Sequence, residues 1–149
     1  RNFREVKELN LENQTAWFSK LSSSPNDYMF GIVDLKTNEL IGACGLLYIN
    51  QIIKSADFSF YIGKDEVYVD DPEGKSYEAA KLLMQYGFER LNLNKIWMEL
   101  YEFDSKKMSF FTEKFSFNID GILRQNCFHD GKYHDSKLLS LLSSEFNEK

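Results

Sequence analysis

The feature that most constrains this fold is a glycine-containing turn that opens directly into a helix, at residues 72–84 (PEGKSYEAAKLLM). Pro72 ends the segment before it, because proline fixes φ and offers no backbone N–H. Gly74 permits a tight turn and a close approach of the backbone to a ligand. From Lys75 onward, no residue before Gly87 breaks a helix. We therefore expect a helix with one apolar, core-facing stripe, made of Ala80, Leu83, Met84, Gly87, Phe88 and Leu91.

The first turn of this helix is suited to an anion, because unpaired N–H groups and the positive end of the helix dipole meet there. Two interpretations stay open: a pyrophosphate cradle, or an ordinary junction between a loop and a helix. The ending Gly74-Lys75-Ser76 is shared with nucleotide P-loops. That motif needs glycine at the position of Val69 and no proline at position 72, so we discard a P-loop.

The composition indicates one globular domain over residues 1–149. Hydrophobic residues make up 43% of the chain and aromatic residues 15%, enough to build one core. The net charge of -5 argues against nonspecific nucleic-acid binding, which needs a basic surface. No apolar run approaches the ~20 residues that span a bilayer, and no signal peptide is visible. Cys44 and Cys127 lack the spacing of a metal pair, so we expect free thiols in the cytoplasm.

Apolar periodicity and turn residues predict a mixed order of helices and strands. Residues 56–62 alternate most clearly, with Phe58, Phe60 and Ile62 on one face. Gly42 and Gly45 in another strand indicate closely packed neighbours. The expected helices cover 2–10, 11–21, 75–91 and 105–114, and the expected strands cover 28–35, 40–49, 56–62, 96–101, 119–129 and 133–142. Ser22–Asn26 is expected to be a loop, and the whole order predicts an α/β sandwich.

Four stretches, in this order and spacing, resemble the Gcn5-related N-acetyltransferase (GNAT) superfamily. They are Leu40–Leu46 (the family's IGxxGL strand), Ser55–Ile62 (the pantetheine strand), Gly74–Ala80 (the acetyl-CoA loop GxGxxxEAxxLL) and Glu113–Phe117 (EKxGF). The resemblance implies an α/β fold with a mixed, mostly antiparallel sheet of six to seven strands, flanked by about four helices. The family's first strand normally precedes the segment that begins at Arg1, so the chain is expected to lack its start.

The C-terminal stretches Gly121–Gln125 and Asp130–Asp135, with Lys54–Phe58, are similar to a narrower branch. That branch acetylates the 4-amino group of UDP-linked amino sugars in pseudaminic-acid-type biosynthesis, and it lies close to the RimJ/RimL-like branch, which acts on ribosomal proteins. Three hypotheses follow: an acetyltransferase for a small amine such as a nucleotide-linked amino sugar, a protein N-terminal acetyltransferase, or a non-catalytic CoA-binding module. Family members often dimerise, so a homodimer is consistent with the resemblance.

The resemblance implies direct transfer of an acetyl group from acetyl-CoA to a primary amine, without a metal. An alkylamine is mostly protonated at pH 7, so a base or a water chain must take its proton. The thioester oxygen needs fixed N–H donors, which the family takes from the strand over 56–62. The positions that correspond to cofactor contacts are Phe60, Tyr61 and Ile62 near the thioester, Gly74, Lys75, Ser76 and Tyr77 at the pyrophosphate, and Ser105 and Lys114 on the later helix.

Asp57 is the first candidate for the base, since it falls where the family often has glutamate. A solvated strand residue or a structural partner is an equally good interpretation of Asp57. Glu99, on the neighbouring strand beside Trp97 and Tyr101, is the second candidate. His134 is a candidate for a substrate contact, although a lone histidine near a hairpin is more often a surface residue or a satisfied core residue. His129 and His134 lack ligand-pair spacing, so we reject a zinc site.

The chain departs from the family at two functional positions. The tyrosine that usually protonates the leaving thiolate is replaced by Thr112. Asp71 stands where the family prefers arginine or glutamine, and Asp70 and Glu73 add further negative charge beside the proposed pyrophosphate. Lys75 and Lys114 are cations that can offset part of this negative charge. The departures put the general acid in doubt and predict weaker CoA binding.

Overall fold

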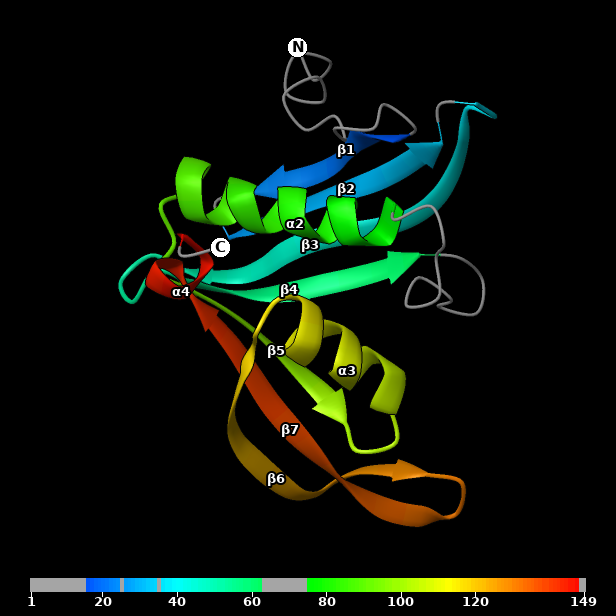
Figure 1. Cartoon of the computed structure of the whole chain (residues 1–149), viewed down its shortest axis with the longest axis vertical. Helices are drawn as coiled ribbons and strands as arrows, with labels where there is room; N and C mark the ends of the chain where they lie inside the picture. The colour runs from blue at the N-terminus through cyan, green and yellow to red at the C-terminus, as the bar shows by residue number, and fades with distance from the viewer. Residues whose placement is uncertain (1–15, 25, 35, 63–74, 148–149) are drawn as a thin grey trace.

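A computed structural model of the chain describes residues 16–24, 26–34, 36–62 and 75–147. Within these ranges seven strands form one sheet in the order β1-β2-β3-β4-β5-β7-β6 (Figure 1). The strands are β1 (Ala16–Ser24), β2 (Asp27–Asp34), β3 (Glu39–Asn50), β4 (Ser55–Ile62), β5 (Lys95–Tyr101), β6 (Asn118–His129) and β7 (Lys132–Leu142). All neighbouring pairs are antiparallel except β4 and β5. The expected mixed, mostly antiparallel sheet of six to seven strands is confirmed.

Polar side chains stabilise the turns that connect β2 to β3 and β3 to β4. The side-chain oxygen Oδ1 of Asp34 accepts a hydrogen bond from the backbone N–H of Lys36 over 2.8 Å, between β2 and β3. Asn50 does the same between β3 and β4, where its Oδ1 accepts from the N–H groups of Ile52 and Ile53 over 2.9 and 3.1 Å. Such local bonds favour tight turns. As a result β3 pairs with β2, and β4 pairs with β3.

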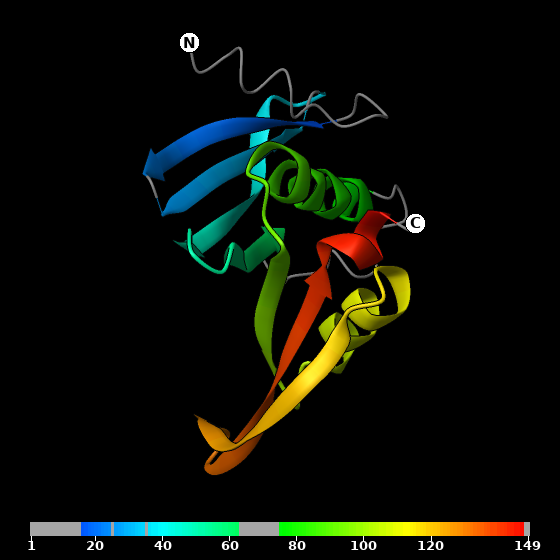
Figure 2. The ribbon, with the colours of Figure 1, turned by 90° about the vertical axis from the view of Figure 1, so that its left-hand side faces the viewer.

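The parallel pair of β4 and β5 requires a crossover, which contains a helix. Helix α2 (Lys75–Gln85) continues into a π-helical turn, η2 (Tyr86–Arg90), before β5 begins. Helix α3 (Ser105–Lys114) follows β5, and the short α4 (Ser143–Asn147) follows β7. Figure 2 shows α2 and α4 on the same side of the sheet. In the described part of the chain, no helix is long and apolar enough to cross a membrane.

One cluster of buried apolar side chains joins these helices to the sheet. Alternation in β4 and β5 directs Ala56, Phe58, Ile96, Met98 and Leu100 into it. The predicted stripe of α2 and η2 is confirmed, because Ala80, Leu83, Met84, Gly87 and Phe88 are buried and Leu91 packs against the cluster. By the same alternation, Asp57, Trp97 and Glu99 lie on the other face of the two strands.

Gly45 confirms the expectation of closely packed neighbours in β3. A Cβ atom added there would lie 2.5 Å from the carbonyl oxygen of Tyr28, on the neighbouring strand β2. Carbon atoms do not approach a backbone oxygen that closely, so a side chain at this position would push β2 and β3 apart. Glycine is therefore required by the spacing of the two strands.

Two expectations near the N-terminus are wrong. Residues 16–21, expected to end a helix over 11–21, lie in β1, which pairs with β2 from Ala16 opposite Asp34 to Ser24 opposite Asp27. The segment Ser22–Asn26, which was expected to be a loop, likewise belongs to β1 as far as Ser24. Pairing with β2 supplies the backbone hydrogen bonds that decide the conformation, and it overrides a weak helical spacing of apolar residues. The helix expected over 2–10 lies outside the described residues.

Both cysteines are free thiols. Cys44 is fully buried in β3, and burial raises the pKa of its thiol far above the usual range. A thiol of this kind is inert, because the thiolate is the nucleophile and the metal ligand. Over the ranges that the structure describes, no three side chains of histidine, cysteine, aspartate or glutamate gather as a metal site would require.

Candidate active site

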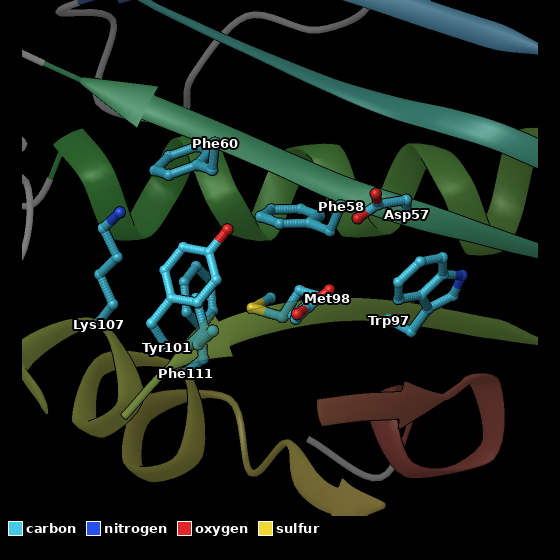
Figure 3. Close-up of a pocket in the computed structure, with 10 residues that line it drawn as sticks. Asp57, Phe58, Phe60, Trp97, Met98, Tyr101, Lys107 and Phe111 are labelled. Carbon is cyan, nitrogen blue, oxygen red and sulfur yellow. The ribbon is translucent and has the colours of Figure 1, made fainter. Parts of the chain in front are cut away.

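The chemistry-bearing residues gather where β4 and β5 separate. The ladder between the two strands has three residue pairs and ends with Asp57 opposite Trp97. Beyond this pair a cavity of about 340 Å³ opens between the strands. Figure 3 shows Asp57 and Trp97 at one end of the gap, with Phe60 and Lys107 at the other. The cavity is therefore elongated and lies between two strands whose backbone groups no longer pair with each other there.

The wall nearest α3 is apolar and aromatic. Phe58 and Phe60 stack with ring centroids 5.7 Å apart, and Phe111 of α3 meets Phe58 edge-on at 5.7 Å. Met98 of β5 completes this part of the lining (Figure 3). The three rings contact one another, so this wall is a continuous aromatic surface. Such a wall suits a slender apolar group rather than a charged one.

The wall on the opposite face is acidic. Asp57 of β4 and Glu99 of β5 both line the cavity. Burial raises the pKa of the Asp57 carboxyl to about 6, and the negative charge of Glu99 adds to the shift. Desolvation disfavours the ionised form and a neighbouring like charge does the same, which explains the direction. Asp57 is thus a carboxyl that changes charge close to neutral pH.

Two hydrogen-bond donors, one on β6 and one on β7, hold the carboxylate of Glu99. The hydroxyl of Ser136, on β7, donates to Glu99 Oε2 over 2.6 Å. The amide of Asn126, on β6, donates to the same oxygen over 2.7 Å and lies 3.3 Å from the Ser136 Oγ. Ser136 is fully buried. The second candidate for the base is therefore a fixed carboxylate rather than a mobile one.

Two residues of the cavity can donate a proton. Tyr101, at the end of β5, stacks on Phe103 with centroids 5.5 Å apart, and its ring stands in the gap between the strands in Figure 3. Lys107 reaches the cavity from α3. Thr112, which replaces the expected tyrosine, instead donates its hydroxyl to the carbonyl of Met108 within α3 over 2.8 Å. Thr112 does not line the cavity in the described part of the chain, so a proton donor would have to come from another position than the family pattern indicates.

The structure brings some of the predicted site residues together and leaves others apart. Asp57, Glu99 and Phe60 line the cavity, and Tyr61 and Ile62 continue the same strand. Lys75, Ser76 and Tyr77 form the first turn of α2, where Tyr77 stacks on Phe115 at 4.9 Å. Ser105 and Lys114 lie at opposite ends of α3, and both are exposed and outside the cavity lining. Gly74 lies outside the described residues.

His134 has a structural environment away from the cavity. Its Nδ1 lies 3.0 Å from Glu102 Oε2, and its Nε2 lies 3.0 Å from the carbonyl oxygen of His129. Phe103 packs edge-on against the His134 ring at 5.0 Å. His129 is half exposed and stacks on Phe103 at 4.2 Å. These contacts join the β6–β7 hairpin to the turn before α3, so the structural interpretation of both histidines is the better one.

Sequence reasoning missed Lys107, Asn126 and Ser136 as site residues. Lys107 could have been found, because it lies four residues before Phe111 and therefore on the same helical face. Asn126 carried no signal, since its approach to Glu99 depends on an irregularity in β6 that alternation does not predict. Ser136 depends on the pairing of β7 with β5, which places it diagonally opposite Glu99.

Comparison with known proteins gives consistent relatives. The family model described as an acetyltransferase (GNAT) domain matches residues 1–112. An uncharacterised N-acetyltransferase, p20 of Bacillus licheniformis, is 28% identical over 141 residues, which cover 95% of this chain and 70% of that protein. Spermidine N(1)-acetyltransferase of Escherichia coli K12 is 27% identical over 108 residues, covering 72% of this chain and 55% of that protein. The chain thus spans between about half and about seven tenths of these relatives.

Solved structures agree on the fold. A variant of spermidine N-acetyltransferase SpeG from Vibrio cholerae superposes with a TM-score of 0.72 at 27% identity, covering 83% of this chain and 68% of that chain. A dodecameric structure of the Vibrio cholerae spermidine N-acetyltransferase gives a TM-score of 0.68 at 28% identity over similar shares. The predicted fold class is confirmed by these similarities. The narrower amino-sugar and ribosomal-protein branches are not represented among these relatives and stay predictions.

Proposed function

This chain belongs to the acetyltransferase (GNAT) family, and from that premise we propose that it transfers the acetyl group of acetyl-CoA directly to a primary amine. The observation that carries the proposal is the Asp57 carboxyl, located where β4 and β5 separate, with its pKa raised to about 6. A base with this pKa is mostly ionised at pH 7 and still binds a proton more strongly than an ordinary aspartate.

The residues of the cavity fit the acetyl end of acetyl-CoA. The apolar wall suits the slender pantetheine arm of acetyl-CoA, and it consists of Phe58, Phe60, Met98 and Phe111. Lys107 adds a positive charge to the cavity. When bound, acetyl-CoA supplies an activated acetyl thioester. The end of β4, with Tyr61 and Ile62, would offer backbone N–H groups along the arm. The first turn of α2 (Lys75, Ser76 and Tyr77), together with Gly74, would hold the pyrophosphate through its N–H groups.

Asp57 would prepare the amine. An ammonium group that enters the acidic side of the cavity meets two carboxylates, and it must lose a proton before its lone pair can attack. Asp57 would accept that proton directly or through one water molecule. Burial raises the pKa of Asp57, and the charge of Glu99 alongside adds to this shift. The partial burial of Asp57 would also limit the access of bulk water to the amine.

Tyr101 is the candidate to return a proton to the leaving thiolate, because it carries the one hydroxyl among the residues that line the cavity in the described part of the chain. Replacing Tyr101 by phenylalanine is expected to lower kcat by roughly 100-fold, in the range of general acid catalysis. KM for the amine should change little, since the ring remains. Free-thiol release at saturating acetyl-CoA measures this. Tyr133→Phe, at an exposed position, serves as the control. An unchanged kcat for Tyr101→Phe would assign the donor role to Lys107.

We infer that the acceptor is a small amine with positive charge, such as a polyamine. Both carboxylates of the site support this, and so do the spermidine acetyltransferases among the relatives. A UDP-linked 4-amino sugar would bring a diphosphate close to Asp57 and Glu99, and like charges would repel each other there. The amino-sugar acceptor and the protein N-terminus therefore become the competing predictions.

An acceptor panel tests the proposal. The purified chain is mixed with acetyl-CoA and, separately, with spermidine, 1,4-diaminobutane, a UDP-linked 4-amino sugar and an N-terminal peptide. Free-thiol release gives the rate, and mass spectrometry identifies the acetylated product. We expect turnover of the polyamines. Turnover of the sugar or the peptide alone would overturn the acceptor class but keep the transferase. No thiol release together with no thermal stabilisation by CoA would overturn the transferase itself.

A further inference from the structure

An irregular stretch of β6 lies across β7 from the active-site cavity. From Leu123 to Cys127 β6 advances four residues, while its partner β7 goes only two residues, from Ser136 to His134. The two extra residues of β6 form a bulge. Gln125 within it has a φ of 49°, a left-handed conformation that residues other than glycine seldom adopt. Its N–H donates to Asp135 Oδ1 over 2.8 Å, which holds the bulge in place.

The bulge redirects Asn126. A regular β6 would be separated from β5 by the whole width of β7. The Asn126 amide nevertheless donates to Glu99 Oε2 on β5 over 2.7 Å, and the buried Ser136 of β7 donates to the same oxygen over 2.6 Å. Bulges characteristically re-aim a side chain next to a functional site. Here the redirected Asn126 side chain binds the carboxylate of Glu99, which lines the cavity together with Asp57.

Both donors bind the same oxygen of Glu99. Within the described residues, Oε1 is then the oxygen left for a ligand, and the carboxylate is fixed by contacts with two other strands. A pre-oriented carboxylate in a partly desolvated cavity binds a cation better than a mobile one, because less conformational entropy is lost on binding. The two carboxylates therefore have different tasks, since Asp57 titrates near neutrality whereas Glu99 is held in position.

We propose that the β6 bulge makes Glu99 an anchor for a second positive charge of the acceptor, with Asn126 and Ser136 as positioning residues for its carboxylate. The inference rests on the proposed acetyltransferase function and deepens it. The acceptor must carry at least two amines, one that reacts near Asp57 and one that stays charged and binds Glu99 Oε1. A monoamine of the same length would lack the second contact.

A comparison of two matched acceptors tests this inference. Steady-state kcat and KM are measured for 1,4-diaminobutane and for 1-aminobutane, with acetyl-CoA saturating, in wild type and in Glu99→Gln, Asn126→Ala and Ser136→Ala. Glu99→Gln should raise KM for the diamine about tenfold, as expected for loss of a partly exposed charge pair. Its KM for the monoamine should rise by a smaller factor, since the monoamine has no second amine that binds Glu99 Oε1. Asn126→Ala and Ser136→Ala should shift KM for the diamine in the same direction by a smaller factor.

Asn118→Ala is the matched control. Asn118 also lies on β6 and also donates to a glutamate, Glu145 Oε2 at 3.0 Å, but it is remote from the cavity lining. Its substitution should leave both KM values unchanged. Thermal unfolding of every variant separates loss of the fold from loss of the anchor. Equal changes for diamine and monoamine, or none for either, would overturn the inference.

The inference and the proposed function can fail separately. Should wild type acetylate neither amine, the proposed function fails, and calorimetric titration of 1,4-diaminobutane then tests the anchor alone. Tighter binding of the diamine than of the monoamine, lost in Glu99→Gln, would support the anchor. Equal binding of the two amines would contradict it.

Discussion

Asp57→Asn is expected to lower kcat by roughly 100- to 10,000-fold, the usual contribution of a general base. Asparagine keeps the shape of the side chain but cannot take a proton from the attacking amine. Free-thiol release with a saturating polyamine acceptor measures the loss. Asp120→Asn removes an exposed carboxylate that pairs with Lys95 at 3.3 Å, and it should leave kcat unchanged. A full rate in Asp57→Asn would return Asp57 to the role of a structural partner.

The pH dependence of kcat/KM tests whether Asp57 is the base. A base must be ionised, so kcat/KM of wild type should fall as the pH drops through about 6, the raised pKa of Asp57. This acid limb should disappear in Asp57→Asn, and the optimum of any residual activity should move upward. In Glu99→Gln the limb should persist but lie at lower pH, because the charge that helps raise the Asp57 pKa is gone. A limb that stays in place in both variants would contradict the assignment.

Loss of activity in Asp57→Asn should not come from loss of stability. The folded state raises the Asp57 pKa from 3.8 to about 6, so it binds this proton more tightly than the unfolded chain does. The stabilisation is complete below pH 3.8 and is lost as the pH rises through about 6. At pH 7.5 the ionised, half-buried carboxylate is thus unfavourable, and asparagine removes it. The variant should unfold at the same temperature as wild type or higher.

Phe111→Ala should have the largest effect on stability. Phe111 is 2% exposed, and its ring contacts Phe58, Phe110 and Phe117 with centroids 5.0–5.7 Å apart. Truncation leaves a cavity between α3 and the sheet, and we expect a loss of roughly 3–5 kcal/mol in the free energy of unfolding. For a domain of this length that corresponds to a decrease of about 10 °C in Tm. Urea and thermal unfolding measure both quantities.

Phe128→Ala is the control for this substitution. Phe128 is 64% exposed on β6, and its ring meets that of Tyr133 with centroids 5.1 Å apart. Its truncation should cost no more than about 1 kcal/mol. Similar midpoints for the two variants would mean that the aromatic packing beneath β4 does not hold α3 on the sheet.

The fold could be predicted where local signals agree with tertiary packing. Alternation in β4 puts Asp57 and Phe58 on opposite faces, and helical spacing gives the buried stripe of α2. The strand at 16–24 was missed, because its serines and scattered apolar residues lack strand propensity and pairing with β2 decides their conformation. The π-helical turn at 86–90 was missed for a similar reason, since it ends a helix whose apolar spacing predicts only α-helical turns.

Residues that line the candidate cavity could be predicted from the sequence, but the residues that hydrogen-bond to them could not. Asp57, Glu99 and Phe60 lie on strands whose alternation is readable, and all three line the cavity. The contact of Asn126 with Glu99 could not be inferred, because it depends on two extra residues in β6. The missing helix tyrosine was visible in the sequence. Tyr101 as a proton donor was not, since only the folded chain brings it to the gap.

The short ladder between β4 and β5 has a consequence for motion. Strands β1 to β4 are held together by long antiparallel ladders, and so are β5, β7 and β6, but three residue pairs join the two groups within the sheet. Local opening along this line leaves the hydrogen bonds inside each group intact. Amide protons beside the gap should therefore exchange with solvent by small openings, while those of β2 and β3 wait for global unfolding. We therefore expect the gap between β4 and β5 to widen by local opening, without global unfolding.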